Sequence, residues 1–159
     1  AAFPDRKLLI HVNHGDLATG QVLWTYLENM PPERLNQITI YGDENALKYL
    51  REQNSDIRVL SLKRLKQALL KYELLGWTGY IPEEIKNMEL HIPLKYAKYL
   101  WGWPNKFVAR MDTVNTQVVI VQGNGQWSEG FDTVDSLQQI PNGYAGYIWT
   151  NRIDKVTQP

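Results

Sequence analysis

The chain has 159 residues, with 17 Lys and Arg against 17 Asp and Glu, and no cysteine. Because the charges balance, no overall field draws the chain toward nucleic acid, and a nucleic-acid partner is not expected. The lack of cysteine excludes disulfides, thiolate metal sites and thiol nucleophiles, but it leaves the compartment open between cytoplasm and periplasm or secretion.

The length suits a single domain with one core, and no apolar run approaches the roughly 20 residues that cross a bilayer, so a soluble chain is expected. The first predicted element is a buried strand at residues 7–13, an apolar run without helical period that ends at turn-forming residues. Apolar residues then recur at spacings of three and four and predict a helix with one face on a sheet: Val22, Leu23, Tyr26, Leu27 and Met30.

Two further strand–helix pairs follow. Residues 37–41 form the next apolar run, and Asp43 is expected to cap a helix whose inward residues are Ala46, Leu47 and Leu50. Residues 57–61 predict a third strand. The helix after it is expected to end at Gly76, with three residues facing inward: Leu65, Leu69 and Tyr72.

The second half of the chain continues the alternation less regularly. Residues 79–82 and 89–93 are short extended pieces, and the sequence leaves open whether either is a strand of the sheet. Residues 105–115 predict a helix, and residues 117–121 predict a strand. The inward residues of that helix are expected to be Phe107, Val108 and Met111.

The C-terminal segment combines a loop, a short helix and a last strand. Residues 122–130 hold three glycines and predict a loop, and Asp132 is expected to cap a helix through Leu137. Residues 144–153 predict the last strand. Strands that alternate with helices favour a parallel α/β sheet with right-handed crossovers, either open and doubly wound or closed into a barrel.

Particular stretches of the sequence resemble a known family. Residues 128–137 and 143–154, residues 76–82 and 101–111, and the strand at 7–13 together resemble the C-terminal part of the glycerophosphodiester phosphodiesterase family. That family folds as a (β/α)8 TIM barrel. The resemblance therefore implies that residues 1–159 form one domain, the C-terminal half of such a barrel, with parallel strands inside and helices outside.

The resemblance also implies an activity. The family uses a divalent metal and two histidines to hydrolyse a glycerophosphodiester to glycerol 3-phosphate and an alcohol. Its histidines stand in N-terminal His-Arg-Gly and His-Asp motifs, and none of His11, His14 and His91 lies in such a motif. We therefore expect no catalytic residue in this chain and no activity of the chain alone. The alternative is a non-catalytic barrel that binds a phosphorylated or polyol ligand.

The family's fourth strand ends Ile-Glu-Ile-Lys, where this chain has Ile10, His11, Val12 and Asn13. By this match, His11 is the candidate ligand of Mg²⁺ or Ca²⁺, although such hard cations prefer oxygen ligands to an imidazole. If Ile10 and Val12 face the helices, His11 points into the barrel and Asn13 lies at its mouth. The alternative role for His11 is that of a hydrogen-bonded core histidine.

The candidate substrate-binding residues are Asn13, Tyr41, Trp149 and Asn151. Trp149 and Asn151 end the last predicted strand, where an aromatic wall and an amide would contact a glycerol or alcohol group. Equally, Trp149 could pack against helices and Asn151 could begin a turn. The expected partner is a small-molecule phosphodiester.

The sequence also bears on two properties of the surface. Residues 96–103 are rich in Tyr and Trp and lie beside Lys95 and Lys98, a composition that suits either a membrane surface or a helix in the core. Aromatic residues on a helix usually build core, so membrane contact is not expected there. The open sheet edges of a partial barrel predict strand pairing between copies of the chain.

Overall fold

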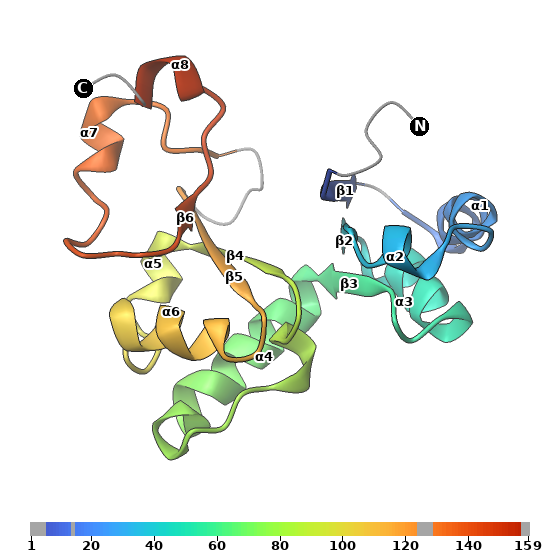
Figure 1. Cartoon of the computed structure of the whole chain (residues 1–159), viewed down its shortest axis with the longest axis horizontal. Coiled ribbons are helices and arrows are strands. Elements are labelled where there is room, and N and C mark those ends of the chain that lie inside the picture. The colour runs from blue at the N-terminus through green and yellow to red at the C-terminus, as the bar shows by residue number, and fades with distance from the viewer. Residues whose placement is uncertain (1–5, 14, 124–128, 157–159) are drawn as a thin grey trace. The chain divides into compact units, whose positions relative to one another are not determined.

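The computed structural model describes residues 6–13, 15–123 and 129–156. The chain divides into two compact units, Ala1–Ala68 and Leu69–Pro159, and each contains a three-stranded parallel sheet with helices (Figure 1). The α/β class and the parallel pairing predicted from the sequence are therefore confirmed. His14 and residues 124–128 of the predicted glycine-rich loop lie outside the described residues.

The first unit contains the sheet β1-β2-β3, in which neighbouring strands run parallel. Its elements are β1 (Leu8–Val12), α1 (Leu17–Leu27), α2 (Pro32–Leu35), β2 (Ile38–Gly42), α3 (Glu44–Gln53) and β3 (Arg58–Ser61), and α4 (Leu62–Leu75) follows β3 and continues into the second unit. All three predicted strands are present, and Asp43 caps α3 by accepting a hydrogen bond from the backbone N of Asn45.

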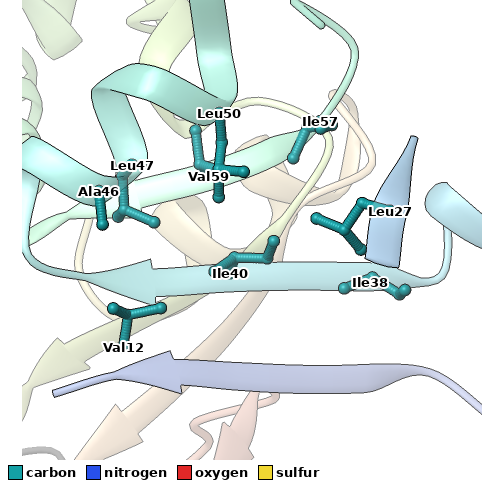
Figure 2. Close-up of a cluster of buried hydrophobic side chains, with 9 residues drawn as sticks. All are labelled: Val12, Leu27, Ile38, Ile40, Ala46, Leu47, Leu50, Ile57 and Val59. Carbon is teal, nitrogen blue, oxygen red and sulfur yellow. The ribbon is translucent and has the colours of Figure 1, made fainter. Parts of the chain in front are cut away.

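One face of this sheet forms the core of the first unit. Figure 2 shows Val12, Ile38, Ile40 and Val59 of the strands directed toward side chains of α1 and α3, with Ile57 beside them. The inward residues predicted for α3, Ala46, Leu47 and Leu50, have no exposed surface. Because side chains alternate along a strand, residues next to this set, such as His11 and Tyr41, lie on the opposite face of the sheet.

The face of α1 that packs is only partly the predicted one. Leu27 is buried and Leu23 packs against the core, but Val22 and Tyr26 are 59% and 69% exposed. No residue of α1 carries a charge. Since apolar residues occur on both sides of this helix, spacing alone could not identify the side that meets the sheet.

The second unit contains the parallel sheet β4-β5-β6. Its elements are η1 (Gly76–Thr78), η2 (Glu83–Ile85), β4 (Glu89–Pro93), α5 (Leu94–Ala97), α6 (Asn105–Asp112), β5 (Gln117–Val121), α7 (Val134–Leu137), β6 (Tyr147–Ile148) and α8 (Ile153–Val156). Residues 89–93 are thus a strand, whereas residues 79–82 are not. The predicted inward residues of α6 are all buried.

Two details of the C-terminal segment differ from prediction. β6 has two residues rather than ten. Before it, the Tyr144 hydroxyl lies 3.0 Å from the carbonyl oxygens of both Val118 and Tyr147. The N-cap of α7 is Thr133, not Asp132: Thr133 and Ser136 exchange hydrogen bonds between side chain and backbone in a capping box. Asp132 has other partners, described below.

Within the described ranges, no helix combines the length and the apolar character needed to cross a membrane.

Candidate functional site

His11 and Tyr41 form a stacked pair in the first unit. The parallel register places them opposite each other on β1 and β2, and their rings lie 4.5 Å apart at 18°. Val12 belongs to the core cluster and Ile10 packs against it, so His11 lies on the sheet face away from α1 and α3, as expected. His11 is exposed and Tyr41 is buried, and burial raises the pKa of the Tyr41 hydroxyl.

Asn13 follows the end of β1 and is exposed. Together with His11 it lines a groove of about 760 Å³ whose other lining residues come from β1 and α1 and are mostly apolar. Val22 and Tyr26, which project from α1, form part of the same groove. Its mostly apolar lining gives it little capacity to hold a phosphate.

A polar network missed by the sequence analysis joins the start of α3 to the end of β3. Glu44 accepts hydrogen bonds from the Ser61 hydroxyl and from Arg51, whose Nη2 lies 2.6 Å from Glu44 Oε1. Burial opposes ionisation of Glu44, but the hydrogen bonds from Ser61 and Arg51 outweigh it, so that the pKa of this carboxyl lies below its usual value.

The described residues alone do not fit a divalent metal. No three His, Cys, Asp or Glu side chains among them come together as a group that could hold an ion. The ring next to His11 is that of Tyr41, and a hard cation requires several oxygen ligands. The assignment of His11 as a ligand of Mg²⁺ or Ca²⁺ therefore stays a prediction, and no chemical step is derived through a metal.

The second unit has a larger and more polar pocket, of about 890 Å³, beyond the carboxyl ends of β4 and β5. Lys95 and Lys98 follow β4 and Gln122 follows β5. Glu129, Asp132 and Trp103 also line the pocket. The carboxyl ends of parallel strands are where α/β folds usually bind ligands. This pocket combines two ammonium groups with two carboxylates, those of Glu129 and Asp132, and an aromatic ring.

Asn151 holds the carboxylate of Asp132 in this pocket. Asp132 accepts hydrogen bonds from the backbone N of Asn151 at 2.7 Å, from its Nδ2 at 3.1 Å and from the Thr150 hydroxyl at 3.0 Å. The hydrogen bonds from the Asn151 side chain and backbone lower the pKa of Asp132. The sequence predicted that Trp149 and Asn151 contact substrate. Asn151 instead contacts Asp132, which lines the pocket.

Trp149 packs on a histidine. Its ring lies 5.6 Å from that of His91 at 58°, and the register puts both residues on the same face of the sheet. Within the described part of the chain, the buried Nε1 of Trp149 has no hydrogen-bond partner. His91 is 4% exposed, in line with the core position expected for it.

The aromatic stretch 96–103 is divided between core and surface. Ala97 and Leu100 are buried, whereas Tyr96 and Tyr99 are 44% and 62% exposed. The ammonium groups of Lys95 and Lys98 lie 4.8 Å and 5.0 Å from the centroids of the Tyr96 and Tyr99 rings. These contacts place the two lysines at the surface beside the pocket.

The structure therefore brings His11, Asn13 and Tyr41 together in the first unit and assigns Trp149 and Asn151 to the second. Sequence reasoning missed Lys95 and Lys98 as pocket residues. The signal that would have found them is their position directly after residues 89–93, which the sequence left undecided as a strand.

Comparison of the chain with models of protein families, with curated proteins and with solved structures finds no match. The family resemblance rests on the sequence motifs alone.

Proposed function

We propose that this chain is the C-terminal half of a (β/α)8 barrel that hydrolyses a glycerophosphodiester to glycerol 3-phosphate and an alcohol. The parallel strands of each unit follow one another in sequence order, β1-β2-β3 and β4-β5-β6, which supports the proposal because a barrel adds its strands one by one in the same direction. The closed barrel and the single domain are parts of this proposal.

The observation that carries the proposal is the pocket at the ends of β4 and β5. The ammonium groups of Lys95 and Lys98 suit a phosphate, which lysine binds as a point charge. The carboxylate of Asp132 suits the hydroxyl groups of glycerol, which donate hydrogen bonds to it. Trp103 supplies an apolar wall for the carbon chain.

The first unit has a different part in this proposal. His11, Asn13 and Tyr41 would line the barrel mouth, and His11 would be one ligand of a Mg²⁺ or Ca²⁺ ion whose oxygen ligands come from outside the described residues. In the proposed reaction a water molecule attacks phosphorus and the alcohol leaves with a proton. The two histidines that move these protons would also come from outside this chain, which lacks their motifs.

A second candidate function is non-catalytic binding of a phosphorylated or polyol ligand in the same barrel. It is favoured by His11 and Asn13, which stand where the family has Glu and Lys. The hydrolase requires the pocket to bind a phosphorylated polyol, and such a ligand is also among those that the non-catalytic function allows.

Calorimetric titration with sn-glycerol 3-phosphate tests whether the pocket binds a phosphorylated polyol. Replacing Lys98 with Ala removes one charge-assisted hydrogen bond, worth about 1.5–3 kcal/mol, so the Kd should rise about tenfold or more. Lys66→Ala is the matched control, because Lys66 is exposed and lies outside the pocket. Equal Kd values for Lys98→Ala and the wild type would contradict the proposed site.

A hydrolysis assay separates the two functions. The chain alone should not hydrolyse glycerophosphocholine in the presence of Mg²⁺ or Ca²⁺, as followed by phosphorus NMR, whereas a longer protein that supplies the two histidine motifs should. Turnover by the chain alone would refute the assignment of the catalytic groups to another part of the protein. Ligand binding without turnover by the longer protein would favour the non-catalytic function.

A further inference from the structure

The pocket at the carboxyl ends of β4 and β5 carries charges of both signs, and the proposed function uses only part of them. Lys95 and Lys98 suit the phosphate and Asp132 suits the glycerol hydroxyl groups, but Glu129 lines the same pocket without a partner in that ligand. The phosphate of a phosphodiester carries a single negative charge. A bound phosphodiester with a neutral alcohol would therefore leave an excess of negative charge in the pocket.

The two signs of charge reach the pocket from different strands. The two lysines follow β4, whereas the segment 129–132 lies along the ends of β5 and β6. The backbone N of Gln122 donates to the carbonyl oxygen of Glu129 at 3.2 Å, and the backbone N of Asn151 donates to Asp132 at 2.7 Å. Since β5 lies between β4 and β6, this arrangement suits a ligand in which a short linker separates the phosphate from a positive group.

The charges of Lys98 and Asp132 are not neutralised by ion pairs. Among the described residues, neither of the two takes part in one. The Lys98 ammonium lies 5.0 Å from the centroid of the Tyr99 ring, and Asp132 accepts hydrogen bonds from the uncharged groups of Thr150 and Asn151. The hydrogen bonds from Asn151 lower the pKa of Asp132, which is therefore ionised at neutral pH. A ligand that carries both charges would meet both of these groups.

Gly123 makes room for the Glu129 carboxylate. Gly123 has a φ of +74°, and a Cβ atom at this position would overlap the carboxylate of Glu129. The position of this carboxylate therefore depends on a glycine that also lines the pocket. A substitution at Gly123 can displace the carboxylate without changing any charge.

The lining of the pocket favours a primary ammonium group over a quaternary one. Proteins recognise quaternary ammonium groups with several aromatic faces arranged as a cage. Trp103 is the single aromatic residue among the described residues that line this pocket. Acceptors of hydrogen bonds are more numerous, because the amides of Gln122 and Gln139 line the pocket together with the two carboxylates. A primary ammonium group has N–H donors for such acceptors, and a quaternary one has none.

On the basis of the proposed function, we propose that the pocket recognises a glycerophosphodiester whose alcohol carries a primary ammonium group, as ethanolamine does, and that Glu129 accepts hydrogen bonds from this group. The positive charge of the ammonium group offsets the repulsion between the phosphate and the two carboxylates. A phosphodiester of a neutral alcohol meets the same repulsion without compensation, so the carboxylates select against it.

Calorimetric titration of the chain with three phosphodiesters tests the proposal: glycerophosphoethanolamine, glycerophosphocholine and glycerophosphoglycerol. The Kd of glycerophosphoethanolamine should be at least about tenfold lower than that of glycerophosphoglycerol, the factor that one charge-assisted hydrogen bond supplies. Glycerophosphocholine has the same net charge but no donor on nitrogen, and it should bind at least about threefold more weakly than glycerophosphoethanolamine.

Two variants test the role of Glu129. Glu129→Gln keeps the shape of the side chain and should raise the Kd of glycerophosphoethanolamine about tenfold, while the Kd of glycerophosphoglycerol should not rise. Gly123→Ala displaces the carboxylate and should change the two Kd values in the same way. Glu73→Gln is the matched control, because Glu73 is exposed on α4 and lies outside the pocket. It should leave all three Kd values unchanged.

The outcomes separate this proposal from the proposed function. Equal Kd values for glycerophosphoethanolamine and glycerophosphoglycerol, or a preference that survives in both Glu129→Gln and Gly123→Ala, would overturn the ammonium site and leave the phosphodiester site intact. Tighter binding of glycerophosphocholine than of glycerophosphoethanolamine would also overturn it. If the chain bound none of the three compounds, the proposed function would fail together with the ammonium site.

Discussion

Glu44 connects α3 to β3, and replacing it with Gln should destabilise the protein. The side chain accepts hydrogen bonds from Ser61, which is 1% exposed, and from Arg51. Gln has the same shape, so the substitution removes the negative charge and little else. Gln can still accept from Ser61, but it loses the ion pair with Arg51 and the favourable position of a carboxylate at the start of a helix.

The expected loss follows from the exposure of the pair. A hydrogen bond to a charged group contributes about 1.5–3 kcal/mol, and the Glu44 and Arg51 side chains remain 33% and 20% exposed. Solvent therefore screens part of the interaction, and we expect the free energy of unfolding to fall by about 1–2 kcal/mol. The exposed pair between Lys48 and Glu52, 3.7 Å apart, should contribute less than about 0.5 kcal/mol.

The effect should depend on pH in a defined direction. The pKa of Glu44 is lowered in the folded protein, so the carboxylate stabilises the fold fully above its unfolded pKa of about 4.3. This stabilisation disappears as the pH falls through the lower folded value. Gln does not titrate, so the difference in stability between wild type and Glu44→Gln should be largest at neutral pH and should shrink in acid.

Urea denaturation followed by circular dichroism measures this difference. Unfolding curves of the wild type, Glu44→Gln and the control Glu52→Gln would be compared at neutral pH and in acid. The reasoning would be refuted if Glu44→Gln cost no more than Glu52→Gln at neutral pH, or if its cost were the same at both pH values.

Three further predictions concern the core, the pocket and the sheet edge. Leu47→Ala removes a fully buried side chain and should lower the free energy of unfolding, measured by urea denaturation, by about 2–5 kcal/mol. A loss smaller than that of a substitution at an exposed position would contradict the placement of Leu47 in the core. Asp132→Ala should shift the amide NMR signal of Asn151 and weaken glycerol 3-phosphate binding. An unchanged signal would exclude the hydrogen bond between the Asn151 backbone N and Asp132. Leu9→Pro blocks a backbone N–H on the side of β1 away from β2, so it should abolish any concentration-dependent association of the chain seen by ultracentrifugation; association that persists would place the contact elsewhere.

Much of the fold could be predicted because its signals are local. The strands at 38–42 and 117–121 are apolar runs flanked by polar turns, and both were expected within a residue or so. The helix face of Ala46, Leu47 and Leu50 is surrounded by charged residues, so the spacing of the apolar residues identified a single side of α3 as the buried one. α1 has no charges, and there the same method wrongly placed Val22 and Tyr26 inside.

The features that the sequence did not predict depend on contacts between residues far apart in the chain. Asp132 precedes a short helix and was expected to cap it, but Asn151 and Thr150 reach it from beyond β6. Glu44 and Ser61 are separated by 17 positions, and only the crossover from α3 to β3 brings them together. No periodicity encodes such pairs.

The sequence also predicted some features of the candidate sites and missed others. The face of β1 that carries His11 followed from simple alternation and is confirmed. The lysines of the second pocket could not be chosen from sequence, because their importance depends on the strand at 89–93 and on Asp132, which is distant in the chain and lines the same pocket.

The most direct test of the central claim, that the carboxyl ends of β4 and β5 bind a phosphorylated polyol, is residue-resolved amide NMR during titration with sn-glycerol 3-phosphate. If the pocket binds this ligand, the shifts should be saturable and concentrated at Lys95, Lys98, Gln122 and Asp132, and glycerol alone should produce much weaker shifts. Shifts that cluster away from these residues, or no saturable shift at all, would contradict it.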